Sequence, residues 1–503
     1  MNTFLNGLQR ETNFDYTENG ALAHKSTNSK VLDMFALCGS FRTLTDNDCI
    51  YMFKQALQEN ESLAMKCLFY LRDIRGGQGE RRFFRVCFKW LAATYPEIAK
   101  RNIANVPEFG RYDDLVYTCL NTKVADSALE FIKHQLAIDV TCKTPSLLAK
   151  WLPSENASAE KTRKAGNVIR QYLNMTHKEY RKVLAELRSR INIVEKLMSE
   201  NRWDEIEFDK IPSKAGMVYK NAFARRDIIA KKYETFAKSD TTKVNAVALY
   251  PYEIVAKALK NTDWYGNSRL SDVDRAIIQK YWENQIDVLQ GQPCKSFFVI
   301  DTSGSMHGSA ADAPINIAIG LGMYCAERVG GPFKNHYISF SSRPQLIEIE
   351  GVDFVDKVTR IYKTNLCENT NIEATFDLLY KIAKTAKPED IPDQIIITSD
   401  MQIDEGTGEY DWRSHTSKGN WTTNSASTLM EKIRMKWENA GLKCPRLVYW
   451  NVDARENTIL DAGPDVSFVS GASPLIIKQV MSGKTGYDLM LEILMTERYA
   501  SVM

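Results

Sequence analysis

Near residue 291 the pattern of apolar residues changes abruptly, and this change limits what the chain can fold into. Over most of the first 260 residues apolar positions recur at helical spacing, and strand-like alternation is scarce. Beyond the breaker Gly291-Gln-Pro, short apolar runs alternate with amphipathic stretches. Since 503 residues are too many for one typical core, more than one domain is expected. The sequence predicts a polar N-terminal arm over 1–30, an all-α region over 31–290 and an α/β domain over 291–503.

The α/β domain is predicted to hold a mostly parallel sheet with helices on both faces, because buried strands and amphipathic helices follow one another along the chain. The expected strands are 296–301, 335–341, 345–350, 393–399 and 446–452. The expected helices are about 313–329, 371–386, 426–440 and 485–494.

The all-α region is predicted to consist of short paired helices, which suggest HEAT-like repeats stacked into a solenoid or ring. One helix is specified in detail. Thr176 and Glu179 form a capping box, and an apolar stripe runs from Tyr180 to Val194. Basic side chains are expected on the opposite face of this helix.

A cluster of oxygen-bearing side chains follows the first expected strand directly. The run Asp301-Thr-Ser-Gly-Ser-Met has the spacing D-x-S-x-S at the carboxyl end of a buried strand, the edge where open α/β sheets bind ligands. Asp301 supplies charge, Ser303 and Ser305 supply small hydroxyl oxygens, and Gly304 allows a tight turn. Hard oxygen ligands with few carboxylates suit Mg²⁺ or Mn²⁺. An ordinary strand-to-helix turn with an Asx cap is the alternative.

Two further residues fall on loops that should reach the same edge. Thr370 precedes an expected helix, and Asp400 follows the strand 393–399. Together with D-x-S-x-S, they resemble the metal-ion-dependent adhesion site of von Willebrand factor A (vWA) domains, which contains a loop threonine and a strand-end aspartate. The resemblance implies that the metal is coordinated by Asp301, Ser303, Ser305, Thr370 and Asp400.

Several motifs in the all-α region are not expected from helix packing alone. They are Leu71-Arg-Asp-Ile-Arg-Gly-Gly-Gln-Gly-Glu-Arg81, Gly110-Arg-Tyr-Asp-Asp-Leu115, Ala149-Lys-Trp-Leu-Pro-Ser154, Ile211-Pro-Ser-Lys-Ala215 with Tyr219 and Arg225-Arg-Asp227, and Tyr250-Pro-Tyr-Glu-Ile-Val255. In this order, ahead of the Asp301 motif, they resemble the TROVE architecture of Ro ribonucleoproteins, and more closely the TROVE-related proteins of bacteria and phages. The resemblance covers roughly residues 30–500. It implies a HEAT-like ring closed by a vWA domain, which binds small structured RNAs and the single-stranded ends of misfolded RNAs.

Charge is unevenly distributed along the chain. The net charge is +2, yet 1–290 carries 44 Lys and Arg against 36 Asp and Glu, while 291–503 carries 21 against 27. Residues 160–235 are the most basic, with 18 against 11. Phosphate contact requires positive side chains opposite a core stripe, so the predicted RNA-binding residues are Lys161, Arg163, Lys164, Arg170, Lys178, Arg181, Lys182 and Arg188. Simple solvation of the helix face, with Glu179 and Glu186 as partners, is the alternative.

Arginines around the Gly-rich turn at 75–79 offer another possible phosphate contact. This turn is not a P-loop, because no Gly-Lys-Ser/Thr follows it. We favour a structural interpretation, in which Asp73 and Glu80 pair with the arginines that flank the turn, Arg72, Arg75, Arg81 and Arg82.

No arrangement of catalytic residues stands out, and the protein is not expected to be an enzyme. The six histidines form no H-E-x-x-H or H-x-E motif, and no G-x-S-x-G elbow occurs. His307 beside the metal motif is a conceivable base, but an exposed loop histidine is the simpler interpretation. The pair Asp113-Asp114 is predicted to cap a helix. The alternative function is a protein-interaction adaptor, whose metal site grips an acidic residue of a partner.

Cysteine usage and the N-terminus indicate the cellular compartment. Ten scattered cysteines without a C-x-x-C pair predict reduced, mostly buried thiols. The first residues lack the basic and apolar regions of a signal peptide, and no run of about 18 apolar residues occurs. A cytoplasmic location without membrane contact is therefore expected.

Overall fold

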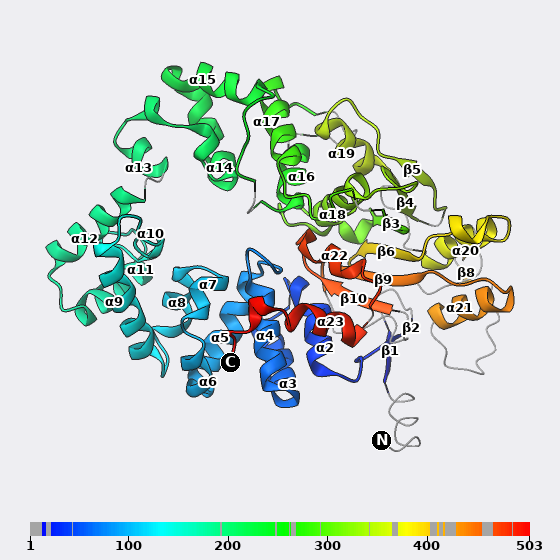
Figure 1. Cartoon of the computed structure of the whole chain (residues 1–503), viewed down its shortest axis with the longest axis horizontal. Coiled ribbons are helices and arrows are strands. Elements are labelled where there is room, and N and C mark those ends of the chain that lie inside the picture. Colours follow the sequence, from blue (N-terminus) through cyan, green and yellow to red (C-terminus); the bar gives the residue numbers. More distant parts are fainter. Residues whose placement is uncertain are drawn as a thin grey trace. The chain divides into compact units, whose positions relative to one another are not determined.

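The chain folds into two compact units, each built from two separate stretches of sequence (Figure 1). The computed structural model describes residues 13–503 except 17–21, 43, 192–193, 247–248, 261, 263–267, 292, 342, 365–370, 403–409, 412–415, 418–428, 455–465 and 485. The sheet unit comprises Met1–Thr45 and Leu249–Ile493. The helical unit comprises Asp46–Ala248 and Leu494–Met503.

The sheet unit is organised around a six-stranded sheet with the order β10-β9-β6-β3-β4-β5. Its strands are β3 (Ser296–Asp301), β4 (His336–Phe340), β5 (Leu346–Glu348), β6 (Gln394–Ser399), β9 (Arg446–Asn451) and β10 (Val466–Ser470). All neighbours pair in parallel except the edge strand β5, which is antiparallel to β4. Every residue of β3 and β6 is buried, which explains their nearly continuous apolar runs. The predicted mostly parallel sheet is confirmed.

Helices pack against this sheet and against one another. They are α2 (Lys30–Leu37), α16 (Pro251–Leu259), α17 (Asp272–Glu283), α18 (Pro314–Arg328), α19 (Phe354–Lys363), α20 (Ile372–Ala383), α21 (Leu429–Asn439), α22 (Ile477–Val480) and α23 (Gly486–Leu494). Two short antiparallel pairs accompany them, β1 (Phe14–Tyr16) with β2 (Leu22–His24) and β7 (Tyr410–Asp411) with β8 (Thr416–Ser417). The central helix α18 contacts β3, β4, β6 and α16.

Two glycines let α18 approach its neighbours closely. A Cβ at Gly322 would lie 2.5 Å from Cγ1 of Ile300 on β3. A Cβ at Gly320 would lie 2.8 Å from the backbone nitrogen of Tyr252 on α16. Because both distances are shorter than van der Waals contact, any larger residue would push α18 away from the sheet or from α16.

β10 and α19 are not among the elements predicted from the sequence. β10 carries two serines, yet all five of its residues are buried. The hydroxyl of Ser470 accepts a hydrogen bond from the backbone N–H of Gly39 at 3.0 Å and lies 3.2 Å from the carbonyl oxygen of Phe35. These partners come from the N-terminal stretch more than 400 residues earlier. Local periodicity cannot reveal a polar strand that is buried by so distant a segment.

The compact units do not follow the predicted boundaries at 30 and 290. Residues 249–290 belong to the sheet unit, because α16 packs on α18 and α17 packs on α19. In addition, Arg275 of α17 forms a bidentate ion pair with Asp353, at 2.6 and 2.7 Å. The N-terminal stretch also contributes to the sheet unit through α2 on β10. The change of pattern near 291 therefore marks the start of the six-stranded sheet at β3. The second stretch of the sheet unit begins earlier, at Leu249.

The helical unit confirms the predicted helix-rich region. Its helices are α3 (Asp46–Glu59), α4 (Glu61–Arg72), α5 (Arg81–Thr94), α6 (Pro96–Arg101), α7 (Asn105–Phe109), α8 (Tyr112–Cys119), α9 (Ala125–Thr141), α10 (Leu148–Trp151), α11 (Glu160–Tyr172), α12 (His177–Arg190), α13 (Val194–Ser199), α14 (Ser213–Arg225) and α15 (Asp227–Lys238). Neighbours in sequence pack together, as α3 does with α4 and α14 with α15. The predicted capping box of α12 is present between Thr176 and Glu179. Its apolar stripe is core, with Tyr180, Leu184 and Leu187 buried.

The segment Leu494–Met503 completes the helical unit. Tyr499 is buried, stacks on Phe109 with ring centroids 5.4 Å apart, and donates a hydrogen bond to the buried carboxylate of Asp73 at 3.1 Å. Arg498 forms a bidentate ion pair with the same carboxylate. The side chain of Asn105 also pairs with Ser501. Side chains of the segment and side chains of the preceding helices and turn thus hold Leu494–Met503 against the helical unit.

We expect Arg498→Ala to destabilise the helical unit by about 2 kcal/mol or more, because it leaves the buried carboxylate of Asp73 without its cationic partner. Thermal or urea unfolding followed by far-ultraviolet circular dichroism would measure the change. Glu497→Ala, at an exposed neighbouring position, should leave the transition unchanged. Equal transitions for both variants would show that the ion pair contributes nothing to stability.

Candidate functional site

The carboxyl ends of β3 and β6 bring two of the predicted metal ligands together. The strands pair in parallel with Ile300 opposite Thr398, so Asp301 and Asp400 emerge at the same edge of the sheet. Both aspartates are buried, at 0% and 1% exposure. Two buried carboxylates at one edge repel each other unless a proton or a cation neutralises them.

Hydrogen bonds fix Asp301 in one orientation. The backbone N–H of Ser303 donates to its Oδ1 at 2.9 Å, and the hydroxyl of Ser399 donates to its Oδ2 at 2.5 Å. Burial and the neighbouring charge of Asp400 nevertheless raise the pKa of Asp301 to about 7. The hydroxyl oxygens of Ser303 and Ser305 lie 3.2 Å apart in the same loop. The predicted set Asp301, Ser303, Ser305 and Asp400 is therefore assembled at one sheet edge, with Ser399 as a supporting residue that the sequence analysis did not identify.

The backbone beside Asp400 is unusual. Met401 follows it directly and has a φ of 63°, a left-handed conformation that a residue with a Cβ rarely adopts. The N–H of Asp400 faces the sulfur of Met306 at 3.3 Å, which joins the end of β6 to the short 3₁₀ turn Gly304–Met306. Backbone strain of this kind clusters at functional sites, where the surrounding structure enforces it.

The predicted threonine ligand, Thr370, lies outside the described residues. The chain that leads toward it contacts the loop after β3 at Thr364, whose carbonyl oxygen accepts a hydrogen bond from the hydroxyl of Thr302 at 2.7 Å. On the other side, Asn371 caps α20 by accepting from the N–H of Ala374. His307 lies next to this region with its Nδ1 3.4 Å from the hydroxyl of Tyr362, and burial lowers its pKa.

The donor set fits a hard divalent cation. Carboxylate and hydroxyl oxygens suit Mg²⁺ or Mn²⁺, and two carboxylates would balance the charge of the ion. No three His, Cys, Asp or Glu side chains gather as metal ligands in the described part of the chain.

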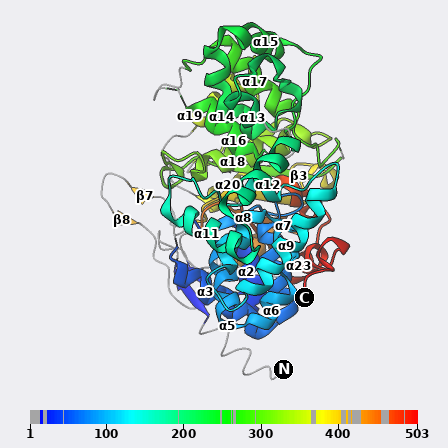
Figure 2. The same cartoon turned by 90° about the vertical axis from the view of Figure 1, so that its left-hand side faces the viewer.

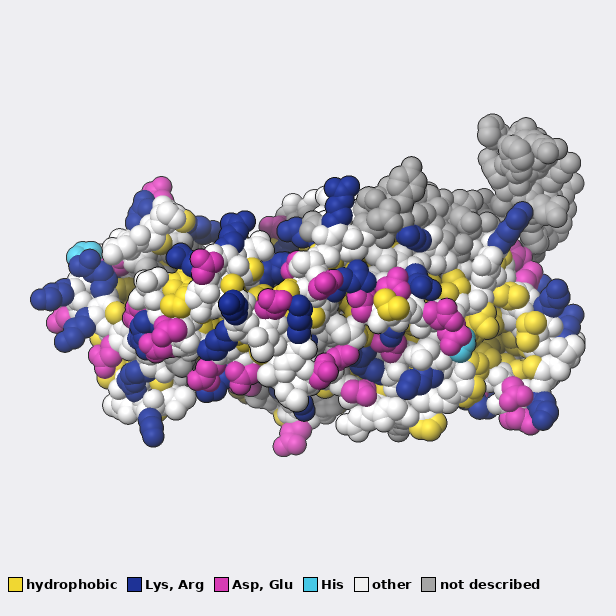
Figure 3. Space-filling model, turned by 90° about the horizontal axis from the view of Figure 1, so that it is seen from above, with side chains coloured by type: hydrophobic (Ala, Val, Ile, Leu, Met, Phe, Trp, Pro, Cys, Tyr) yellow, Lys and Arg dark blue, Asp and Glu magenta, His cyan; other side chains and the backbone are white. Residues whose placement is uncertain are grey.

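The second predicted site lies on α11 and α12 of the helical unit, which face the viewer together with α8 and α9 in Figure 2. Lys178, Arg181 and Lys182 are exposed on α12, opposite its core stripe. None of these three side chains forms an ion pair with a described acidic residue, since Glu179 is engaged in the capping box. Figure 3 shows Lys and Arg side chains, interspersed with acidic ones, at the left-hand end, where α12 lies in Figure 1. Lys161 and Lys164 are exposed on α11, and Lys164 pairs with Glu160 at 2.8 Å.

The other three predicted cations donate to groups within the helical unit. Arg163 donates to the carbonyl oxygens of Ala157 and Ser158. Arg170 pairs with the buried carboxylate of Glu155 at 2.8 Å. Arg188 donates to the carbonyl oxygens of Ala149 and Leu152 and to the hydroxyl of Ser154, all within 3.0 Å. These three arginines therefore hold the loop before α11. Arg181 donates to the carbonyl oxygen of His177 in its own helix at 3.1 Å, and it is exposed like the four lysines.

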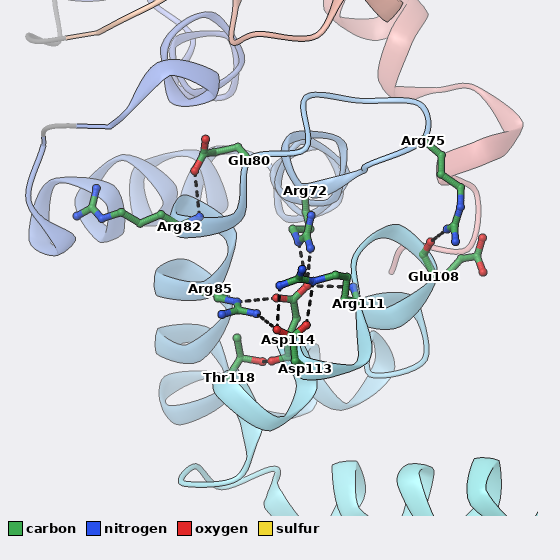
Figure 4. A network of polar contacts seen from close by, with 10 residues as sticks. All are labelled: Arg72, Arg75, Glu80, Arg82, Arg85, Glu108, Arg111, Asp113, Asp114 and Thr118. Carbon is green, nitrogen blue, oxygen red and sulfur yellow. Dashed lines mark hydrogen bonds and ion pairs between the residues drawn. The ribbon is translucent and has the colours of Figure 1, made fainter. Parts of the chain in front are cut away.

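Three of the arginines near the Gly-rich turn, Arg72, Arg75 and Arg82, have structural partners, but their side chains bind groups other than those predicted. Buried Arg72 pairs with buried Asp114 at 2.8 Å, and Arg85 bridges Asp114 and Asp113 (Figure 4). Arg111 also binds Asp113. Asp73 accepts the backbone N–H of Arg75 at 2.9 Å, but the side chain that forms an ion pair with its carboxylate is that of Arg498.

The same network confirms that the Asp113-Asp114 pair caps a helix. It also shows that Asp114 has a second role, which the sequence alone does not reveal. Asp114 accepts from the N–H of Arg111 at the start of α8, as a cap should. It also faces two arginines from α4 and α5, which lie about 30 to 40 residues earlier in the chain. Glu80 caps α5 by accepting from the N–H of Arg82 at 3.0 Å.

Two exposed or half-exposed aromatic residues, Tyr117 and Trp151, were not recognised as site residues. Tyr180, on the predicted apolar stripe, is core, with its hydroxyl donating to the carbonyl oxygen of Pro153. Trp151 stands in one of the unexplained motifs, Ala149-Lys-Trp-Leu-Pro-Ser154, and Tyr117 follows another, Gly110-Arg-Tyr-Asp-Asp-Leu115. These two motifs were therefore the only feature of the sequence that pointed to Trp151 and Tyr117.

The first comparison concerns families. The profile of a family described as Domain of unknown function (DUF2828) matches residues 17–115 and 135–293, just over half of the chain. The chain belongs to this family. A second profile, Domain of unknown function (DUF7788), matches residues 295–497. The two profiles meet directly before β3, at the change of pattern seen in the sequence.

Similar proteins were also found among curated sequences and solved structures. The uncharacterized protein L728 of Acanthamoeba polyphaga mimivirus is 27% identical, over 94% of this chain and 85% of that protein. The crystal structure of the Deinococcus radiodurans Ro (RSR) protein matches 95% of this chain and 100% of its own, with 12% identity and a TM-score of 0.46. At this score and identity, no function is transferred from the Deinococcus protein. Within the described part of the chain, no helix combines the length and apolar composition that crossing a membrane requires.

Proposed function

We propose that the helical unit binds RNA through the exposed cationic face of α11 and α12. The observation that carries this proposal is the set Lys178, Arg181 and Lys182, which is exposed and forms no ion pair with the acidic residues described. Spacings of three and four residues place these side chains on one face of the helix. Arg181 donates to the carbonyl oxygen of His177 in its own helix, and no described carboxylate neutralises any of the three. Cations that are not neutralised by carboxylates can contact phosphates and release the counterions that drive nucleic-acid binding.

The order of sequence motifs supports the same proposal. The Gly-rich turn, the Gly110–Leu115 run and the Ala149–Ser154 run precede D-x-S-x-S in the order that resembles TROVE proteins. The RNA would be small and structured, or misfolded with a single-stranded end, as that resemblance implies. The protein would act as a Ro-like scaffold for such RNA in the cytoplasm, and the proposal includes no catalytic step.

Reversal of these three charges tests the proposal. We expect Lys178→Glu, Arg181→Glu and Lys182→Glu together to weaken binding of a tailed hairpin RNA tenfold or more at about 0.1 M salt, where the Debye length is about 10 Å. The slope of log affinity against log salt concentration should also become shallower, because fewer counterions are released. Fluorescence anisotropy across a salt series would measure both quantities.

A matched control comes from the sheet unit. Lys381, Lys384 and Lys387 are exposed there, and their replacement by Glu changes the net charge by the same amount. This control variant should bind RNA like the wild type. If both triple variants lose affinity equally, the effect reflects net charge alone, and the α11–α12 face is an ordinary solvated surface. If the wild type binds no RNA, the proposal fails outright.

A second candidate function rests on the strand-end carboxylates. We propose that Asp301, Ser303, Ser305 and Asp400 bind Mg²⁺ or Mn²⁺ together with Thr370. The observation that supports this proposal is the burial of two adjacent carboxylates with serine hydroxyls beside them. A metal held by these residues would bind a further oxygen ligand, so the sheet unit would also bind an acidic residue of a protein partner. The two candidate sites lie in different compact units, and both functions can coexist.

A further inference from the structure

Two aromatic side chains of the helical unit lie against cations. Tyr117 of α8 is 47% exposed, and its ring centroid lies 4.7 Å from Cζ of Arg85 and 4.9 Å from Nζ of Lys161. Trp151, the half-buried last residue of α10, has Cζ of Arg111 at 4.0 Å and Nζ of Lys150 at 5.7 Å. Each ring thus carries one guanidinium and one ammonium group, a pattern that the proposed α12 contacts do not use.

The two rings belong to one continuous row of side chains. Asp113 binds Arg85 at 2.7 Å and Arg111 at 2.9 Å (Figure 4). These two arginines are the ones that cover Tyr117 and Trp151. Asp113 and Tyr117 are four residues apart on α8 and therefore share a face of the helix. Arg111 and Tyr117 are separated by six residues, or about 9 Å along the helix axis. A flexible strand could place one base at each ring.

The row carries an excess of positive charge. Asp113 and Asp114 are its two carboxylates, and they face three arginines, Arg72, Arg85 and Arg111. Lys150 and Lys161 add two further positive charges at the rings. Exposed Arg81 lies near enough to Arg111 to act on it electrostatically. A surface with this excess of positive charge attracts a polyanion.

The geometry points to a stacking site for unpaired RNA bases on Tyr117 and Trp151, and this assignment rests on the proposed RNA binding. Arg85 and Arg111 are already held by carboxylates, so they would lose little freedom when a base packs on them. The exposed ammonium of Lys161 would leave the face of Tyr117 and neutralise a phosphate, and a base would take its place on the ring. Stacking of this kind tolerates any base, because every base presents a π-face.

Removal of the exposed ring tests the site. We expect Tyr117→Ala to bind a single-stranded oligouridine at least about fivefold more weakly than the wild type, the lower end of the effect of one stacked base. The salt slope should stay unchanged, because tyrosine neutralises no phosphate. Lys161→Gln should instead lower the slope by about 0.7, the value for one contact on a single strand. A 2-aminopurine placed in the oligonucleotide should lose its fluorescence on binding to the wild type and keep more of it with Tyr117→Ala.

Two control variants separate stacking from folding. Tyr117→Phe keeps the ring and should bind like the wild type. Tyr51→Ala removes a tyrosine that is 60% exposed on α3 of the same unit and should also have no effect. Trp151→Leu provides a second variant, whose fold is checked by its melting temperature because Trp151 is half-buried.

The outcomes distinguish this inference from the proposed function. If Tyr117→Ala and Trp151→Leu bind like the wild type while the α12 triple variant is weakened, the stacking site is overturned and RNA binding by α12 stands. If Tyr117→Ala changes the salt slope as Lys161→Gln does, the ring acts through charge alone and the stacking site is also overturned. If the wild type binds neither the oligouridine nor the tailed hairpin, the proposed function fails and the stacking site with it.

Discussion

Replacement of Asp301 by asparagine is expected to have two opposite effects on the sheet unit. Without metal, the variant should be more stable than the wild type, because one of two adjacent buried negative charges is gone while the hydrogen bond from the N–H of Ser303 can remain. With Mg²⁺, the wild type should gain about 2.7 kcal/mol when the ion exceeds its dissociation constant a hundredfold, and the variant should gain nothing. The order of the two melting temperatures would therefore reverse on addition of Mg²⁺.

Calorimetric titration with Mg²⁺ and Mn²⁺ would test the same prediction directly. The control is Asp312→Asn, which removes an exposed acid shortly after the D-x-S-x-S loop and should leave metal binding intact. Unchanged affinity in the Asp301 variant would contradict the assignment of this residue as a ligand. A wild-type melting temperature that does not respond to either ion would contradict the metal site as a whole.

Asp114→Ala is expected to be the most destabilising single change in the helical unit. Asp114 is fully buried, and Arg72, which is 2% exposed, would be left as a buried charge without a partner. The cap on α8 would be lost as well. Removal of one member of such a pair costs about 3–5 kcal/mol, a large part of the stability of a typical domain. Urea unfolding followed by circular dichroism would measure the loss.

Two companion variants make the test specific. Asp113→Ala removes a neighbouring carboxylate that is 25% exposed, so the cost should stay below about 1 kcal/mol. The double variant Arg72→Met with Asp114→Leu removes both buried charges and should recover much of the lost stability. If the double variant is as unstable as Asp114→Ala, the cost arises from the lost cap and packing and not from an unpaired charge.

The fold of the sheet unit was largely predictable because its strands are short, buried and apolar. The run Phe297–Ile300 predicted a buried strand, and the placement of Asp301 and Asp400 at strand ends followed from the alternation of strands and helices. Strand β10 was not predictable, because its serines are satisfied by residues of the N-terminal stretch. Ser399 was missed for a similar reason, since its role depends on a neighbouring strand and not on its own motif.

The cationic site was only partly predictable. Helical spacing placed Lys178, Arg181 and Lys182 opposite the core, and the structure leaves them exposed. The same reasoning could not show that Arg188 reaches back to the carbonyl oxygens of Ala149 and Leu152, because those groups belong to another helix and its following loop. A count of basic residues therefore predicts a charged region but does not distinguish cations that bind a ligand from cations that hold a loop.

Neither compact unit is a continuous stretch of chain, and this constrains the order in which they can mature during synthesis. The helical unit has nearly all of its residues once Ala248 has been made, but Leu494–Met503 reaches it about 250 residues later. Until then Asp73, Phe109 and Tyr70 lack the partners that Arg498 and Tyr499 provide. The N-terminal stretch must likewise wait for β10. Contacts over such sequence separations slow folding, and a ribosome-bound chain would expose these surfaces for much of its synthesis. Chaperones that shield apolar surface on nascent chains should therefore associate with this protein until Leu494–Met503 has emerged.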